Sequence, residues 1–319
     1  MPKHSKKGCW RFKMSNIKIL ITYHDKHPAL KSDILTPIQT GCVTAPKLFA
    51  GMLRDDEGEN ISGKNPNYCE LTAQYWAWKN YDKLGNPNHI GFMHYRRQFM
   101  FDGWRGDPNC VWLPAGDVYF IPFITGSYFK RFADKAIRDT LSETDCVAIT
   151  PYDVKNIGSE NLREQYGKLE EQKVENFDVF IRTAKEIAPD YVKEIEMIET
   201  GSVQYLCNMF VMLRELFFRY NEFCFPILFE TEKRIHIGDN DRTLGYFGEF
   251  LLTVFMFKLK AEGVRIKELP ASYILSDDIY RHPRLSFFFY KFLSKITFGK
   301  MRKKFKSKKR QLKQICRCR

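Results

Sequence analysis

The residues best suited to chemistry follow a short apolar run, IGFMHYRRQF, which spans residues 90–99. Within it, His94, Tyr95, Arg96 and Arg97 come directly after strand-like residues. In open α/β sheets, side chains beyond the carboxyl end of a strand point into a ligand crevice, and a guanidinium is a planar fork that matches phosphate oxygens. Two adjacent forks could therefore hold a diphosphate without a metal ion. The residues alone fit equally well with two surface ion pairs and a core histidine.

An acidic loop is a second candidate site. Asp55, Asp56, Glu57 and Glu59 lie in the polar stretch 54–67, and Asp-rich loops supply the hard oxygen ligands that divalent cations prefer. A solvated acidic loop is the commoner reason for such a sequence, so this interpretation stays the weaker one.

Two further carboxylates could act on a substrate. Glu249, in GYFGEFLLTVF, is expected to open an apolar helix, where the helix dipole favours a negative charge. It is either a simple cap or a partly buried general base. Asp241 ends the sequence Asp-Asn-Asp, which has metal-binding spacing but also the composition of an exposed turn.

Several common catalytic motifs are missing from the sequence. It has no Gly-rich phosphate loop, no Gly-x-Ser-x-Gly elbow and no His-Glu-x-x-His motif. Hydride transfer, P-loop hydrolysis and zinc-protease chemistry therefore lose their main sequence support.

Strand-like and helix-like segments alternate along the chain, which predicts an α/β fold with one core. Asn67 is a plausible N-cap for the first helix. The expected strands are residues 16–23, 89–94, 117–122, 145–150, 203–213 and 264–269, and the expected helices are residues 68–81, 160–187 and 246–260.

Basic residues are concentrated at the two ends of the chain. The net charge is +13, yet residues 281–319 hold 15 Lys/Arg and residues 1–15 hold five, with no acid in either segment. The remaining residues, 16–280, are mildly acidic. We therefore predict a basic N-terminal segment (1–15), one globular domain (16–280) and a separate basic tail (281–319).

The tail has the composition of an amphipathic, polybasic membrane anchor. Each Lys or Arg near an anionic membrane contributes roughly 1 kcal/mol to the free energy of membrane binding, and phenylalanines buried in the lipid strengthen binding further. We predict attachment to an anionic membrane surface and expect no nucleic-acid partner. A disordered basic tail is the alternative. On a helical wheel the apolar face consists of Leu285, Phe288, Phe289, Phe292, Leu293 and Ile296.

The nine cysteines form no Cys-x-x-Cys pair, which argues against a zinc site. The sequence begins without an apolar signal peptide and contains no uninterrupted run of about 18 apolar residues. Together with the odd cysteine count, this predicts reduced thiols in a cytoplasmic protein.

Five segments resemble, in order, the bacterial family of domain of unknown function 4422. They are KILITYHDKHPALKSDILTPIQTG, DDEGENISGKNPNYCELTAQYWAWKN, IGFMHYRRQF, CNMFVMLRELFFRY and RTLGYFGEFLL, and the resemblance covers residues 18–275. This family lies among capsular-polysaccharide, exopolysaccharide and O-antigen glycosyltransferases. The resemblance implies a GT-A-like nucleotide-sugar transferase fold, with a single mixed, mostly parallel sheet flanked by helices.

The resemblance also implies a donor site. GT-A transferases usually place an Asp-x-Asp metal pair where this chain has His94, Tyr95, Arg96 and Arg97. These residues are therefore expected to hold the donor pyrophosphate, which puts metal dependence in doubt. Mn²⁺ or Mg²⁺ stays a candidate cofactor with no ligands assigned. His24 and Lys26, in the loop after the first strand, are expected to meet the nucleotide.

The same resemblance places the acceptor near Asn208 and Tyr246. Glu249 is the expected general base of an inverting displacement, with Asp241 as second choice.

The implied activity is hexose transfer from a nucleotide-diphosphate sugar, UDP-linked, to a lipid-linked saccharide in cell-surface polysaccharide biosynthesis. Galactose and galactofuranose are the candidate sugars. The protein would then be peripheral at the inner face of the cell membrane. The alternative is a non-catalytic peripheral membrane protein that binds lipid or another polyanion.

Overall fold

The structure is a computed structural model that describes residues 16–25, 29–101, 111–113, 118–121, 132–169, 172–238 and 241–274, together with Phe292 and Lys306. The basic segment 1–15, the candidate nucleotide contact Lys26 and almost all of the tail lie outside the described residues. The division into three segments therefore stays a prediction.

The first half of the central sheet is parallel. β1 (Ile17–Tyr23) pairs in parallel with both β2 (Leu35–Gln39) and β4 (His89–His94), and β2 pairs in parallel with β3 (Leu53–Arg54). All six residues of β4 are buried, which explains why the run between its two terminal histidines is apolar rather than alternating.

The second half of the sheet is mixed. β11 (Phe210–Leu213) lies antiparallel between β4 and β8 (Cys146–Ile149), and β12 (Ile266–Leu269) pairs in parallel with β8. The order across this part of the sheet is β3-β2-β1-β4-β11-β8-β12. Over the whole sheet, most paired positions are in parallel ladders, as expected from the sequence.

The sheet continues beyond the end of β4 through a tight hairpin. β5 (Arg97–Phe99) pairs with β4 only at His94 and Arg97, so Tyr95 and Arg96 form the turn. The prediction of a single sheet is wrong in one respect, because a second, two-stranded sheet is present. The extension contains β13 (Ala271–Ile274), β7 (Val118–Ile121) and β6 (Val111–Leu113), and the small sheet contains β9 (Tyr152–Asp153) and β10 (Val203–Gln204).

Strand residues alternate between two hydrophobic cores, so the prediction of one core is wrong. Leu20, Ile90 and Phe210 point into the core that faces the large helices, whereas their neighbours Ile19 and Val211 point into the core on the opposite face. The period-two alternation of strand side chains thus divides the apolar residues between two helix-covered faces. Helix α4 (Asp134–Ser142) packs on the second face.

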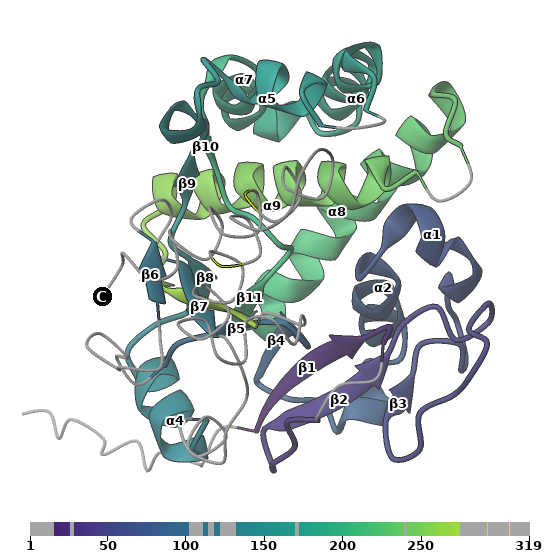
Figure 1. The fold of residues 1–319 in the computed structure, drawn as a ribbon, viewed down its shortest axis with the longest axis vertical. Helices are drawn as coiled ribbons and strands as arrows, with labels where there is room; N and C mark the ends of the chain where they lie inside the picture. The colour runs from purple at the N-terminus through teal and green to yellow at the C-terminus, as the bar shows by residue number, and fades with distance from the viewer. Residues whose placement is uncertain are drawn as a thin grey trace, which may run out of the picture.

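Three helices cover the first face, and three more form an outer layer over two of these (Figure 1). The covering helices are α2 (Leu71–Lys79), α8 (Arg214–Arg234) and α9 (Thr243–Ala261), and the outer ones are α5 (Leu162–Gly167), α6 (Val174–Ile187) and α7 (Val192–Thr200). The short elements are α1 (Asn65–Tyr68), η1 (Ser62–Lys64), η2 (Tyr81–Leu84), η3 (Val154–Ile157) and η4 (Pro189–Tyr191). Among the described residues, no helix is both long and apolar enough to cross a bilayer.

Two predicted elements are interrupted by residues with left-handed backbone. The helix predicted over residues 68–81 breaks at Cys69, whose φ is 52°, and Asn67 therefore does not cap it. The strand predicted over residues 203–213 breaks at Cys207 and Asn208, with φ of 70° and 47°. Neither helix nor strand can continue through positive φ, which explains both breaks.

The predicted start of the helix that carries Glu249 is also wrong. α9 begins at Thr243, so Glu249 lies in the second turn and not at the N-terminal end. The helix predicted over residues 160–187 is divided into α5 and α6.

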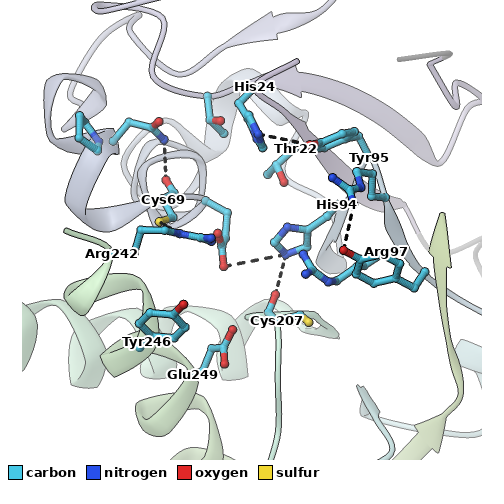
Figure 2. A pocket seen from close by; sticks show the side chains of 16 residues that line it. Thr22, His24, Cys69, His94, Tyr95, Arg97, Cys207, Arg242, Tyr246 and Glu249 are labelled. Atoms are coloured by element: carbon cyan, nitrogen blue, oxygen red, sulfur yellow. Dashed lines mark hydrogen bonds and ion pairs between the residues drawn. The ribbon is translucent and has the colours of Figure 1, made fainter. Parts of the chain in front are cut away.

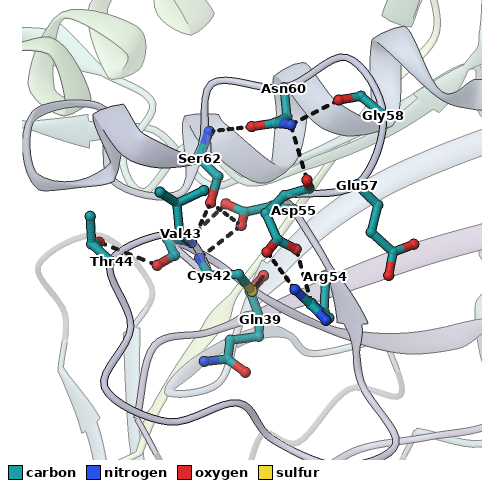
Figure 3. Close-up of polar contacts among 12 residues, drawn as sticks. Gln39, Cys42, Val43, Thr44, Arg54, Asp55, Glu57, Gly58, Asn60 and Ser62 are labelled. Carbon is teal, nitrogen blue, oxygen red and sulfur yellow. Dashed lines mark hydrogen bonds and ion pairs between the residues drawn. The ribbon is translucent and has the colours of Figure 1, made fainter.

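The acidic loop is built around one fully buried carboxylate. Asp55 accepts hydrogen bonds from the backbone N–H groups of Gly41 (2.8 Å) and Cys42 (3.0 Å). It also accepts from the hydroxyls of Ser62 (2.6 Å) and Thr72 (2.6 Å). Figure 3 shows this carboxylate at the centre of the loop, with Glu57 pointing away from it. Asp55 therefore stabilises the loop itself, and the metal-binding interpretation of these residues is not supported.

Candidate active site

A cavity of about 540 Å³ opens at the carboxyl ends of the parallel strands β1, β2 and β4 (Figure 2). β2 and β4 lie on opposite sides of β1, so this is the point where the strand order reverses. Ligands of open α/β sheets bind at such points. The lining residues are Thr22, His24, Thr40, Asn65, Pro66, Cys69, Glu70, His94, Tyr95, Arg96, Arg97, Cys207, Arg242, Tyr246, Glu249 and Tyr273.

The two neighbouring arginines differ in how they are held. Arg96 donates from Nε to the Ile274 carbonyl (3.2 Å) and from a terminal nitrogen to the Tyr273 hydroxyl (2.9 Å). Arg97 lies over the Tyr273 ring, 4.9 Å from its centroid, and its guanidinium makes no hydrogen bond or ion pair with any described residue. The Arg97 donors are thus open to a ligand, whereas Arg96 is largely engaged by the protein.

His94 is neutral and has a defined tautomer. Its Nε2 lies 2.6 Å from the Cys207 carbonyl oxygen and must carry the proton to donate to it. Burial lowers the pKa of His94, so the Nδ1 atom is an acceptor at neutral pH. The Nε2 atom is also 4.0 Å from Oε1 of Glu70.

His24 and Tyr95 form a pair on the cavity wall. The Tyr95 hydroxyl is 3.2 Å from His24 Nε2, and the two rings meet edge to face. Burial lowers the pKa of His24 as well. The wall beside the strand ends therefore carries two neutral imidazoles along with the arginines.

Glu249 lies on the opposite, α9 side of the cavity, together with Tyr246 (Figure 2). Burial raises its pKa to about 7, and the negative charge of Glu70 adds to that shift, while a hydrogen bond from the Cys207 backbone opposes it. Gln204 Nε2 donates to Oε2 at 3.2 Å. A carboxylate with a pKa near the working pH is well suited to general base catalysis.

Two charged residues that line the cavity were missed by the sequence-based prediction, along with its uncharged lining residues such as Thr22 and Tyr273. Glu70 precedes α2 and faces the cavity because the chain breaks at Cys69, a conformation that the sequence did not signal. Arg242 donates from Nε to the Cys69 sulfur at 3.3 Å. Arg242 directly follows Asp241. The Asp-Asn-Asp motif led the prediction to Asp241 instead of Arg242.

The other two predicted residues do not line the cavity. Asn208 is 1% exposed and its Nδ2 donates to Glu70 Oε1 at 2.8 Å. Asp241 Oδ1 accepts from the Thr243 backbone N–H (2.9 Å) and hydroxyl (2.6 Å), so it anchors the start of α9.

The cavity combines three guanidiniums with two carboxylates, one of which titrates near neutrality. This balance favours an anionic ligand.

Within the described ranges, no group of three or more His, Cys, Asp or Glu side chains is arranged to hold a metal ion, and all five described cysteines are free thiols.

Comparison with known proteins gives two matches. Residues 18–260 match the family described as Domain of unknown function (DUF4422). The fold is similar to the apo structure of WbbM, a bifunctional glycosyltransferase, with a TM-score of 0.73 and 30% sequence identity. That match covers 82% of this chain but 46% of the other, so this chain spans less than half of WbbM. No curated protein matches the sequence.

Proposed function

This chain belongs to the family of domain of unknown function 4422. From its similarity to the bifunctional glycosyltransferase WbbM, we propose that it is a glycosyltransferase. It would move a hexose, galactose or galactofuranose, from a UDP-linked sugar to a lipid-linked saccharide in cell-surface polysaccharide biosynthesis. One observation carries the proposal: the open guanidinium of Arg97 faces a cavity whose opposite wall holds Glu249 with a pKa of about 7.

The donor diphosphate is proposed to bind at the strand ends. Arg97 offers a planar fork that no described residue bonds, and His94, Tyr95 and Arg96 complete that wall. Charge-assisted bonds from guanidinium to phosphate are short and about twice as strong as neutral ones. His24 would contact the nucleotide from the end of β1. Lys26, outside the described residues, keeps the same proposed role.

The acceptor is proposed to lie between the donor and α9. Glu249 would take the proton of the acceptor hydroxyl while the oxygen attacks the anomeric carbon. The bond between that carbon and the diphosphate breaks on the opposite face, and UDP leaves with the electron pair. Tyr246, one turn before Glu249 on α9, provides an aromatic surface for the acceptor sugar. Asp241 is a weaker candidate base because Thr243 occupies its oxygen.

A thermal-shift panel tests this function. UDP, GDP and CMP sugars, each with and without Mn²⁺ or Mg²⁺, are added to the full chain. A ligand at 100 times its Kd stabilises the folded state by about 2.7 kcal/mol, so a clear rise in Tm is expected with UDP sugars. Stabilisation only when metal is present would show that the guanidiniums alone do not suffice to bind the donor diphosphate. No stabilisation by any nucleotide would favour a non-catalytic polyanion-binding protein.

Membrane attachment through the tail is a separate proposal. An acceptor carried on a membrane lipid calls for an enzyme held at the inner membrane face, and residues 281–319 combine an apolar face with 15 basic residues. Deleting residues 284–319 is expected to move the protein from the membrane pellet to the soluble fraction.

Deleting residues 1–15 is the matched control, since it removes five basic residues without an apolar face. Persistent pelleting of the 284–319 deletion would refute the anchor.

A further inference from the structure

The loop between β10 and β11 has an unusual backbone at the floor of the cavity. Cys207 and Asn208 are consecutive non-glycine residues with φ of 70° and 47°. Asparagine tolerates the left-handed region, but each such residue costs energy that surrounding contacts must offset. Conformations of this kind cluster at functional sites, so the contacts of the pair indicate its role.

The backbone of Cys207 connects the two walls of the cavity. Its carbonyl oxygen accepts the hydrogen bond from His94 Nε2 at 2.6 Å. Its N–H lies on the side of Glu249 and lowers the pKa of that carboxyl group. One peptide segment thus fixes a group on the β4 side relative to a group on α9.

The side chain of Asn208 adds a third link. Its Nδ2 donates to Glu70 Oε1 (2.8 Å) and to the Gly245 carbonyl (3.1 Å), so one amide joins the start of α2 to α9. The Oδ1 atom is buried and has no hydrogen-bond partner among the described residues. A Cβ at position 248 would lie 3.1 Å from this oxygen, so Gly248 leaves the room that the amide needs.

We propose that Asn208 is a positioning residue that holds the Glu70 carboxylate against Glu249 and His94, and does not itself contact the acceptor. The inference deepens the proposed transferase function and rests on it for its catalytic meaning. The geometric claim stands on the contacts alone: without the Asn208 amide, Glu70 loses the bonded donor that keeps it in place.

The charged groups that face Glu249 show how the position of Glu70 affects it. Glu70 faces it from the start of α2, Arg97 from β5 and Arg242 from the start of α9. With Glu70 held close, its negative charge helps to keep Glu249 poised as a base near neutral pH.

The test is an NMR pH titration of the full chain labelled with ¹³C at glutamate carboxyl carbons. The Glu249 signal is assigned by its loss in Glu249→Gln. In Asn208→Gly, the backbone keeps its left-handed conformation at no cost, but Glu70 is released, so the Glu249 midpoint is expected to fall by about one pH unit. In Asn208→Asp, a third carboxyl group enters, and the midpoint is expected to rise by about one unit.

Asn221→Asp is the matched control. Asn221 is fully buried in α8, where its amide bonds to Phe217 and Gln74 away from the cavity, so the Glu249 midpoint should remain that of the wild type. A wild-type midpoint in Asn208→Gly would overturn the proposal, and so would an equal shift in Asn221→Asp. If Asn208→Asp fails to fold, the glycine variant decides. The titration needs no nucleotide, so a failed nucleotide panel would refute the transferase function without altering this result.

Discussion

Glu249→Gln is expected to lower the turnover number by about 10²–10⁴-fold while leaving the KM for the donor close to that of the wild type. Glutamine has the same size and its amide oxygen can still accept from Gln204 Nε2, but it cannot accept the proton of the acceptor hydroxyl. Donor binding depends on the opposite wall, at Arg97. Turnover is measured as UDP release from a UDP sugar in the presence of lipid-linked saccharide extracted from bacterial membranes.

The pH profile gives a second readout of the same residue. The pKa of Glu249 is raised to about 7, and a base works only when deprotonated, so wild-type activity should be low below that pH and rise through it. Glu222→Gln, an exposed change on α8, is the control and should keep the wild-type rate and profile. Near-full turnover in Glu249→Gln would contradict the assignment.

Arg97→Ala is expected to have a similarly large effect, but on donor use. Hydrogen bonds to charged groups contribute about 1.5–3 kcal/mol each, and loss of a bidentate pair predicts a fall in kcat/KM of about 10²–10⁴-fold. Arg97→Lys should recover part of this loss, since an ammonium restores the charge but not the planar fork.

Arg182→Ala controls for the loss of one positive charge, because Arg182 is exposed on α6. If Arg97→Ala keeps the wild-type kcat/KM, phosphate binding must be assigned to another group, and Arg242 is the next guanidinium in the cavity.

Local sequence patterns were sufficient to predict those features of the fold and site that depend on a single segment of the chain. The apolar run before His94 predicted both β4 and the position of Arg96 and Arg97 just beyond its carboxyl end. Both follow from consecutive residues, since a run of apolar residues indicates a buried strand and the polar residues after it mark its end. The α/β class was predicted for the same reason, whereas the helix-flanked sheet was implied by the family resemblance, and both are confirmed.

The remaining site residues depend on contacts that no local pattern encodes. Glu70 faces the cavity only because Cys69 adopts positive φ, and cysteine gives no sign of that conformation. Glu249 was singled out as a polar residue in an apolar helix, but the reason given, the helix N-terminus, was wrong. Its raised pKa comes from burial and from Glu70, which is 179 positions away in the sequence.

The most direct measurement of the central claim is a crystal structure of the full chain with UDP, grown once with EDTA and once with Mn²⁺. The account predicts UDP at the carboxyl ends of β1 and β4, with diphosphate oxygens about 2.7–2.9 Å from the Arg97 guanidinium in both crystals. UDP bound elsewhere, or with its diphosphate turned away from Arg97, would contradict it.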